Sequence, residues 1–369
     1  MPTSRRIAVI FGTRPEAIKL APVILALREA GAPHVVVTTG QHAELVDDVL
    51  QAFGIIPDVD LGLMREEQGL DYVLASAVEV VGRELDRLSP SAVVVQGDTT
   101  SMLGAALAAF HRGIPVAHVE AGLRSHDMAL PFPEEMNRRV ASVVATWHFA
   151  PTERAAANLR VAGVRDGIHV VGNTVVDAVR HITSGADAAL PAELDEFIGE
   201  APYVLATAHR RESWGAGIAA VAAGLRAALD DLPEHRLLFV THPNPLARRP
   251  VEEALAGHDR ALVSGALPYA TFLRLLRGAR LAVSDSGGIQ EEGPTLGVPV
   301  LVTREVTERP EGVAAGAVRL IGTDADAVRD AAVSLIGSAS ELGAMAHAGH
   351  GLYGDGYAAG RIVRAIADA

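Results

Sequence analysis

Short runs of apolar and β-branched residues alternate with longer stretches of helical periodicity along most of the chain. In the first half, strands are predicted at residues 7–11, 35–39, 92–95 and 116–119. Each run is followed by polar residues, a glycine and a helical stretch. The first helix is expected over 16–30, with Thr13 as its cap and Pro15 near its first turn. This alternation is typical of βαβ units around a parallel sheet.

The pattern starts again near residues 168–174, where the letters HVVGNT precede a helix expected over about 175–181. Further strands are predicted at 203–207, 237–241, 261–264, 281–284 and 298–302. We therefore predict two doubly wound α/β domains, residues 1–170 and 171–369, with the C-terminal helix able to pack back on the first domain. In open α/β sheets, ligands bind beyond the carboxyl ends of the strands, so the residues after each strand are the functional candidates.

Composition and charge narrow the possible partners. Hydrophobic residues make up 49% of the 369 residues and aromatic residues only 4%, which suits buried parallel strands covered by helices. The formal net charge of −13 argues against nucleic acid or an anionic membrane as a partner. The chain has no cysteine, which excludes disulfides, thiolate catalysis, cysteine-ligated zinc and iron–sulfur clusters.

The apolar run at 7–11 is short for the core of a signal peptide, and no stretch approaches the ~18 apolar residues that span a bilayer. We expect a soluble, cytoplasmic protein.

Polar motifs follow the predicted strands. They are GTRPE at 12–16 with Lys19, GDTT at 97–100, EAGLR at 120–124, PFPEE at 131–135, HRRE at 209–212, HPNP at 242–245, DSGGIQEE at 285–292 and TERPE at 307–311. The turn at 286–288 opens a helix, and exposed amides at a helix N-terminus can bind phosphate. The Glu292 carboxylate in that helix can accept hydrogen bonds from both hydroxyl groups of a ribose. An isolated SGG is more often a plain tight turn, but Arg309 and the other strand-end cations favour the phosphate site here.

The sequence lacks the motifs of dinucleotide-binding proteins, P-loop nucleotide hydrolases and zinc deaminases. The first strand leads into GTRPE instead of G-x-G-x-x-G, and no G-x-x-x-x-G-K-[ST] is present. His118 and Glu120 form H-x-E, but the cysteines of a zinc deaminase are missing. His209 and His242 each follow a predicted strand, where phosphate contact is favoured over metal binding. We expect no metal site.

Three acids remain in the first domain, Asp98, Glu120 and Glu134. Each by itself is compatible with a helix cap, an ion pair or a solvated loop. All three, however, follow strands or a proline-rich loop and are expected to face the same cleft. Clustered carboxylates can have their pKa values driven apart, which provides one acid and one base.

Together these motifs resemble the non-hydrolysing bacterial UDP-N-acetylglucosamine 2-epimerases. The resemblance rests on GTRPE-x-x-K, GDTT, HVEAGLR, PEE-x-N-R, HRRE, SDSGGIQEE, TERPEGV and YGDG, in order from Gly12 to Gly356. It implies a glycosyltransferase-B-like fold, with two Rossmann-like domains and the substrate in the interdomain cleft. It also implies a homodimer that needs no added cofactor and interconverts UDP-N-acetylglucosamine and UDP-N-acetylmannosamine.

The resemblance also implies roles for particular residues. Catalysis falls on Asp98, Glu120, Glu134 and His209. The UDP contacts fall on Arg14, Lys19, Ser286, Gly287, Gly288, Glu292 and Arg309, with Phe272 and Leu267 beside the uracil. An effector site in some members matches Gln41, His42, Arg210 and His242. This chain has Glu44 and Glu67 where some relatives have Gln and Arg, so activation by a second substrate molecule is expected to be weak or to use a rearranged site.

Three alternatives stay open from the residues alone. A hydrolysing epimerase would release free N-acetylmannosamine and UDP. A glycosyltransferase would use the same donor site, and a nucleotide-sugar sensor would bind without turnover. The three acids argue against a pure sensor, because buried acids beside an anionic ligand cost affinity.

Overall fold

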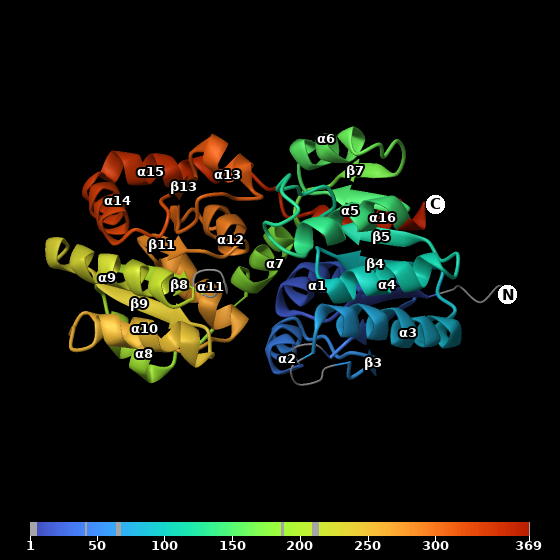
Figure 1. The fold of residues 1–369 in the computed structure, drawn as a ribbon, viewed down its shortest axis with the longest axis horizontal. Helices are drawn as coiled ribbons and strands as arrows, with labels where there is room; N and C mark the ends of the chain where they lie inside the picture. Colours follow the sequence, from blue (N-terminus) through green and yellow to red (C-terminus); the bar gives the residue numbers. More distant parts are fainter. Residues whose placement is uncertain (1–5, 41–42, 64–67, 186–187, 209–213, 369) are drawn as a thin grey trace. The chain divides into compact units, whose positions relative to one another are not determined.

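The computed structural model describes residues 6–40, 43–63, 68–185, 188–208 and 214–368. The chain divides into two compact units (Figure 1). Unit 1 runs to Ile182 and resumes at Tyr353, and unit 2 comprises Thr183–Leu352. The division therefore follows Ile182, whereas the sequence pattern placed it near residue 170.

Unit 1 is built on one parallel sheet in the order β3-β2-β1-β4-β5-β6-β7. Its strands are β1 (Ile7–Phe11), β2 (His34–Thr38), β3 (Val59–Asp60), β4 (Ala92–Gln96), β5 (Val116–Val119), β6 (Trp147–Ala150) and β7 (Ile168–Val170). The strand order reverses between β1 and β4, which makes this pair the topological switch point where open α/β sheets bind ligands. The loops after β1 and β4 carry the GTRPE and GDTT motifs.

Helices cover both faces of this sheet. They are α1 (Arg14–Glu29), α2 (Ala43–Ala52), α3 (Leu70–Leu88), α4 (Thr100–Phe110), α5 (Glu134–Val144), α6 (Glu153–Val161), α7 (Thr174–Thr183) and α16 (Ala358–Ala367). Helices α3, α4 and α5 lie over one face, and α16 packs beside α1 (Figure 1). The core on the α3–α5 side is almost entirely aliphatic, because alternate strand residues such as Val93 and Val95 meet the alanines of α4.

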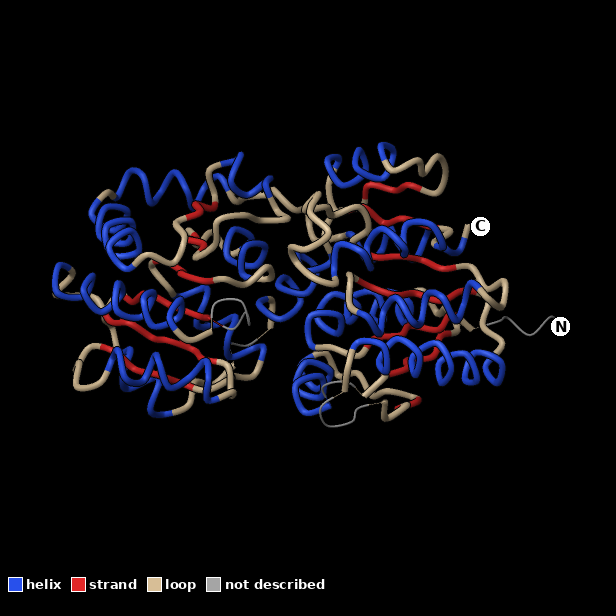
Figure 2. The backbone as a smooth tube through the Cα atoms, in the orientation of Figure 1, coloured by secondary structure: helices blue, strands red, loops and turns tan. Residues whose placement is uncertain are grey.

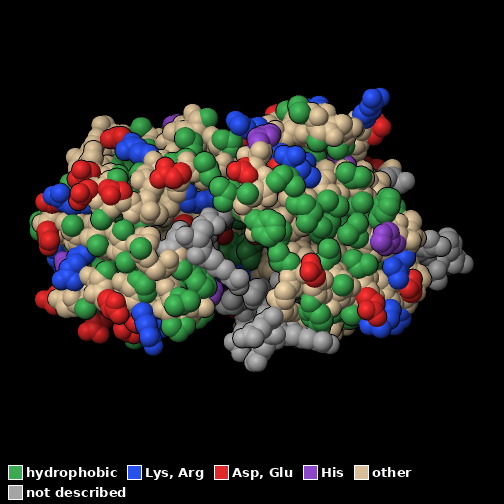
Figure 3. Space-filling model, viewed as in Figure 1, with side chains coloured by type: hydrophobic (Ala, Val, Ile, Leu, Met, Phe, Trp, Pro, Cys, Tyr) green, Lys and Arg blue, Asp and Glu red, His purple; other side chains and the backbone are tan. Residues whose placement is uncertain are grey.

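Some apolar side chains of unit 1 remain outside this core. Phe110 at the end of α4 and Val143 on α5 are 53% and 82% exposed. The two helices contact each other, and Figure 3 shows hydrophobic side chains gathered on the face where they lie.

Unit 2 repeats the architecture with a parallel sheet in the order β10-β9-β8-β11-β12-β13. Its strands are β8 (Tyr203–Ala208), β9 (Arg236–Thr241), β10 (Ala261–Ser264), β11 (Leu281–Ser284), β12 (Val300–Val302) and β13 (Val318–Leu320). Its helices are α8 (Ala192–Ile198), α9 (Ala216–Asp231), α10 (Pro245–Leu255), α11 (Tyr269–Gly278), α12 (Ile289–Thr295), α13 (Pro310–Ala315), α14 (Ala325–Gly337) and α15 (Ala339–Ala348). The switch point lies between β8 and β11, and the loop after β11 holds the SGG turn.

Figure 2 shows helices on both sides of the strands in each unit, the layering expected from the sequence pattern. The predicted strands at 7–11, 116–119, 261–264 and 281–284 have these bounds in the structure. Strands β3, β6 and β13 were not predicted. Among the described residues, no helix is both long enough and apolar enough to cross a membrane.

Candidate functional site

Glu16 fastens together the two loops at the switch point of unit 1. Its Oε2 atom accepts hydrogen bonds from the backbone N–H groups of Gly12 and Thr13, both at 2.8 Å. Its Oε1 atom accepts from Thr99 Oγ1 at 2.5 Å. Burial raises the pKa of Glu16, and the hydrogen bonds from Thr99, Gly12 and Thr13 offset this only in part. Sequence reasoning missed this role, although Thr13 followed three residues later by Glu16 is a capping-box signal.

Glu120 follows β5 and is held between two donors. Lys19 Nζ lies 2.5 Å from its Oε1 atom, and the Gln96 amide donates to Oε2. All three side chains are buried. Glu120 also has a φ of +64°, a left-handed backbone conformation that costs a non-glycine residue about 1–3 kcal/mol. The surrounding contacts therefore hold this carboxylate in one strained position.

Lys19 was expected to contact UDP. The structure places its ammonium group on Glu120, within unit 1. This interaction joins α1 to the residue that follows β5, and Lys19 is only 5% exposed. The cation therefore belongs to the immediate environment of a candidate catalytic acid.

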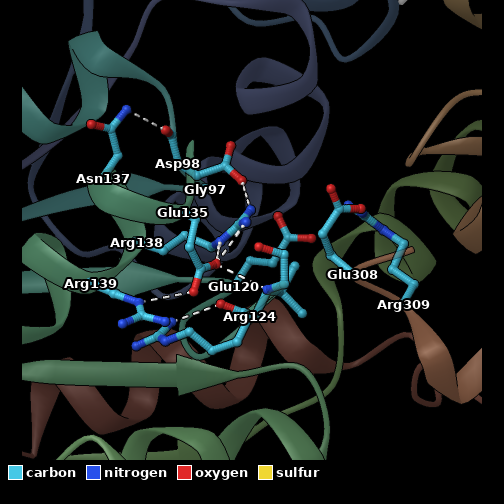
Figure 4. A network of polar contacts seen from close by, with 12 residues as sticks. Gly97, Asp98, Glu120, Arg124, Glu135, Asn137, Arg138, Arg139, Glu308 and Arg309 are labelled. Carbon is cyan, nitrogen blue, oxygen red and sulfur yellow. Dashed lines mark hydrogen bonds and ion pairs between the residues drawn. The ribbon is translucent and has the colours of Figure 1, made fainter. Parts of the chain in front are cut away.

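Asp98 follows β4 and is anchored from α5. Arg138 Nη1 donates to Asp98 Oδ2 at 2.5 Å, and Asn137 Nδ2 donates to the Asp98 carbonyl at 2.8 Å (Figure 4). The Asp98 side chain keeps 31% of its surface exposed, whereas that of Arg138 keeps 3%. The carboxylate thus combines a buried cationic partner with access to solvent.

Arg138 is also held by Glu135, the centre of a buried network of charged side chains. Glu135 Oε2 accepts from Arg138 Nη2 at 3.0 Å and from the Ser125 N–H at 3.0 Å, and its Oε1 accepts from Arg139 Nε at 3.0 Å (Figure 4). Burial works to raise the pKa of Glu135, but the bonds from Ser125, Arg139 and Arg138 outweigh it, so the pKa lies below its ordinary value. Sequence reasoning did not identify Glu135 or Arg138, since the spacing of PEE-x-N-R does not tell which acid faces the core.

The third predicted acid, Glu134, is the first residue of α5 and is half-buried. It follows a loop in which the Leu130–Pro131 and Phe132–Pro133 peptide bonds are both cis. Asp98, Glu120 and Glu134 therefore all belong to unit 1, and each stands at the start of a loop or helix that follows the sheet.

His118 lies two residues before Glu120 on β5. Its Nε2 atom is 2.7 Å from the Gly97 carbonyl, and the side chain is buried. Burial lowers its pKa to about 4, and the positive charges of Arg124 and Arg138 act in the same direction. The ring is therefore neutral near pH 7 and bonds the peptide next to Asp98. The H-x-E pattern of the sequence marked His118 only in connection with zinc.

In unit 2, the SGG turn and Arg309 form one structure. The turn links β11 to α12, as expected, and the Ser286 N–H donates to Ser284 Oγ at 2.9 Å. A Cβ atom on Gly287 would lie 2.7 Å from Arg309 Nη1, so a larger residue at this position would force the guanidinium to shift. Arg309 Nε donates to Glu291 Oε1 at 2.5 Å, and its Nη1 lies 3.6 Å from Glu308 Oε2. The cation is thereby fixed over the turn.

The remaining described residues that were expected to contact UDP are Glu292, Phe272 and Leu267 in unit 2 and Arg14 in unit 1. Glu292 lies in the first turn of α12 and accepts a hydrogen bond from the Tyr269 hydroxyl at 3.0 Å. Phe272 on α11 and Leu267 just before it are both half-buried. Arg14, in unit 1, is half-buried at the start of α1.

Several predicted residues lie outside the described part of the chain. These are His209 among the catalytic candidates and Gln41, His42 and Arg210 among the effector candidates, together with Glu67 and the side chain of Glu44. The remaining effector candidate, His242, follows β9, and its ring lies 5.8 Å from that of Trp214. Among the residues that the structure does describe, no group of three or more His, Asp or Glu side chains could hold a metal ion.

Comparison with known proteins gives concordant matches over nearly the whole chain. The family model described as UDP-N-acetylglucosamine 2-epimerase matches residues 26–367. A probable UDP-N-acetylglucosamine 2-epimerase of Ralstonia nicotianae is 44% identical over 370 residues, with 98% of each chain covered. The crystal structure of UDP-GlcNAc 2-epimerase from Neisseria meningitidis bound to UDP-GlcNAc has a TM-score of 0.92 at 37% identity, and the match covers 99% of this chain and 100% of that one.

The fold extends to a more distant enzyme. A spinosyn rhamnosyltransferase in complex with spinosyn aglycone is 16% identical, has a TM-score of 0.56 and is matched over 98% of this chain and 96% of its own. At this identity the likeness concerns the fold alone. With the two parallel sheets, it confirms the predicted glycosyltransferase-B-like α/β class.

Proposed function

Because this chain belongs to the UDP-N-acetylglucosamine 2-epimerase family, and so is an enzyme of that kind, we propose that it interconverts UDP-N-acetylglucosamine and UDP-N-acetylmannosamine without releasing free sugar. The family resemblance drawn from the motifs is confirmed. The observation that carries the proposed chemistry is that Asp98 and Glu120 follow neighbouring strands and that each is paired with a buried cation at 2.5 Å.

The reaction begins with departure of UDP from C1 of the sugar. Direct removal of the C2 proton would leave a poorly stabilised carbanion, because no carbonyl adjoins C2 in the ring. Once the C1–O bond breaks, the oxocarbenium-like sugar makes the C2–H acidic, and loss of that proton gives a 2-acetamidoglycal and UDP. Return of a proton on the opposite face of C2, with UDP adding back to C1, completes the inversion.

The residues around the SGG turn suit the diphosphate that departs. Arg309 and the N-terminal end of α12 place positive charge and backbone amides at one point, where they stabilise the negative charge that develops on the leaving group. Ser286, Gly287, Gly288 and Glu292 complete this contact set, with Phe272 and Leu267 beside the base. His209 and Arg14 are proposed to contact the diphosphate as well.

The carboxylates of unit 1 suit the proton transfers. Inversion requires an acid or base on each face of C2, and Asp98, Glu120 and Glu134 are proposed to provide them. Arg138 and Lys19 form ion pairs with Asp98 and Glu120, respectively, and so hold each carboxylate in a defined position.

Product analysis tests this proposal against its alternatives. The enzyme is incubated with UDP-N-acetylglucosamine alone, and the products are separated by anion exchange. We expect a mixture of two UDP-sugars. Stoichiometric UDP and free N-acetylmannosamine would show a hydrolysing enzyme, and transfer that occurs only with an added acceptor would show a glycosyltransferase.

We also propose a homodimer that works in the cytoplasm. The exposed Phe110 and Val143 on the adjoining helices α4 and α5 support an interface on this face of unit 1, since exposed apolar patches often mark sites of association. A Val143→Lys change should shift the mass measured by light scattering from dimer to monomer. An unchanged mass would place the interface elsewhere.

Activation by a second substrate molecule is proposed to be weak. Glu44 and Glu67 occupy positions where some relatives have Gln and Arg, and such acids would disfavour a diphosphate-bearing effector at the matching site. A reaction started from UDP-N-acetylmannosamine alone should therefore proceed without a lag. A long lag that traces of UDP-N-acetylglucosamine abolish would contradict this.

A further inference from the structure

Two reciprocal contacts join the strands that carry Asp98 and Glu120. The Gln96 side chain at the end of β4 donates to the carboxylate of Glu120, which follows β5. The His118 side chain on β5 bonds the carbonyl of Gly97, which follows β4, at 2.7 Å. Strand pairing aligns Gln96 with Val119, so each side chain reaches across to the loop of the other strand.

We infer that Gln96 and His118 are positioning residues that together fix the carboxylates of Asp98 and Glu120 relative to each other. This inference rests on the proposed function, in which both carboxylates act on one sugar. Gln96 acts on Glu120 directly, through the side-chain hydrogen bond. His118 acts on Asp98 through the peptide that precedes it.

The state of the His118 ring makes it a reliable donor. Because a carbonyl oxygen can only accept, the Nε2 atom that faces Gly97 must carry a hydrogen. The other ring nitrogen, Nδ1, is buried and has no hydrogen-bond partner among the described residues. With its pKa lowered to about 4 by burial, the ring stays neutral and keeps this one tautomer at physiological pH.

The turn that His118 contacts is anchored at two successive carbonyl groups. His118 bonds the carbonyl of Gly97, and Asn137 Nδ2 bonds the carbonyl of Asp98. Gly97 has a φ of +81°, a conformation open mainly to glycine, so the turn bends sharply at this residue. Rotation of the Gly97–Asp98 peptide would break the bond from His118. Misplacement of a reacting group by ~1 Å can cost about 10²-fold in rate.

The test removes each donor while keeping the size of the side chain similar. His118→Phe and Gln96→Met should lower kcat roughly 10–100-fold, because the two carboxylates lose their alignment. KM for UDP-N-acetylglucosamine and the Kd for UDP should change little, since most of the proposed nucleotide contacts belong to unit 2. More turnovers should end in free UDP and 2-acetamidoglycal, because reprotonation becomes slow relative to release.

Two further variants separate positioning from general support of the fold. His118→Gln keeps an N–H donor and should recover most of kcat and suppress the release of glycal. His148→Phe is the matched control. His148 lies opposite His118 on β6 and is equally buried, but it bonds the Ala145 backbone. This control should keep kcat and product partition near wild type.

A double variant combines His118→Phe with Gln96→Met. Its loss in kcat should be smaller than the product of the two single losses, because either change alone already lets the two carboxylates move relative to each other. Equal kcat and equal glycal release in His118→Phe and His148→Phe would overturn the inference. If His118→Phe does not fold by circular dichroism, Gln96→Met carries the test, and wild-type kcat without glycal release in that variant would overturn it. A wild-type enzyme that forms no UDP-N-acetylmannosamine would instead contradict the proposed function.

Discussion

The Lys19 ammonium lies 2.5 Å from the Glu120 carboxylate, and both side chains are more than nine-tenths buried. Each charge of this ion pair depends on the other, because removal of either partner would leave the remaining charge buried and poorly solvated. The Glu120 backbone is itself in the left-handed region. Fixing this one acid therefore takes a cation from α1, an amide from β4 and a strained peptide after β5.

Removal of the cation should destabilise unit 1. Lys19→Met leaves the Glu120 charge buried without its partner, and we expect a loss of about 3–5 kcal/mol in the free energy of unfolding. Urea unfolding of unit 1 can be followed through Trp147 on β6 in a Trp214→Phe background. Lys19→Arg, which keeps the charge, should lose less. Equal stability of Lys19→Met and the wild type would show that the pair contributes nothing.

The three acids themselves should be essential for turnover. Asp98→Asn, Glu120→Gln and Glu134→Gln each keep the shape of the side chain and remove its charge. Loss of a positioned acid or base costs ~10²–10⁴-fold in rate, or about 3–5 kcal/mol of barrier. Steady-state kcat of each folded variant measures this. Any of the three that turns over at nearly the wild-type rate has no part in the proton transfers.

The alternation of apolar runs with helical stretches predicted the architecture, because parallel strands that are buried on both faces consist of continuous runs of aliphatic residues. It failed where strands depart from that pattern. Strand β6 reads WHFA and carries a histidine, and β13 has only three residues with Arg319 at its centre. Neither resembles an aliphatic run, so both become visible only when a neighbouring strand pairs with them.

Candidate residues were predictable where the motif itself defines the local geometry. The SGG turn after an apolar strand was expected to open a helix, and it does so at Ile289. The partners of the acids were not predictable in this way. Lys19 and Glu120 are separated by 101 positions and Arg138 and Asp98 by 40, and nothing local to either residue signals such a contact.

Two buried histidines should make unit 1 sensitive to acid. Burial lowers the pKa of His118 and of His148 to about 4, whereas the unfolded chain protonates histidine near pH 6.5. Between these values the unfolded state binds more protons, so stability is fully present above about pH 6.5 and falls as the pH drops toward about 4. The loss reaches about 3 kcal/mol for each histidine.

The Trp147 unfolding transition measured between about pH 7.5 and about pH 4.5 checks this, because most of the loss falls between the unfolded-state pKa near 6.5 and the folded-state pKa of about 4. The His118→Gln, His148→Gln double variant should show a flatter dependence on pH. If the wild type and the double variant have the same slope, other groups are responsible for the acid sensitivity.

The Arg309 guanidinium should matter both for binding and for the rate. Arg309→Ala is expected to raise KM for UDP-N-acetylglucosamine and to lower kcat, because the cation stabilises charge that grows as UDP departs. A change in KM alone would limit Arg309 to ground-state binding. Gly287→Ala should act in the same direction, since its Cβ would lie 2.7 Å from Arg309 Nη1 and displace the cation.

Gly337→Ala is the control for the Gly287→Ala variant. Gly337 lies in α14 of the same unit, and a Cβ there would meet no atom within 4 Å. Its kinetic constants should match the wild type. If the Gly287→Ala enzyme is as active as the Gly337→Ala enzyme, catalysis does not require the Arg309 guanidinium to lie over the turn.

The fate of the C2 proton is the most direct test of elimination and re-addition with acids on both faces of the sugar. The enzyme is incubated with UDP-N-acetylglucosamine in D₂O, and the isolated UDP-N-acetylmannosamine is analysed by proton NMR. The account predicts deuterium at C2 of the product, because the abstracted proton exchanges with solvent before a proton returns on the other face. Product that retains its C2 hydrogen in full would contradict the account, since the same hydrogen would then have to be carried from one face to the other.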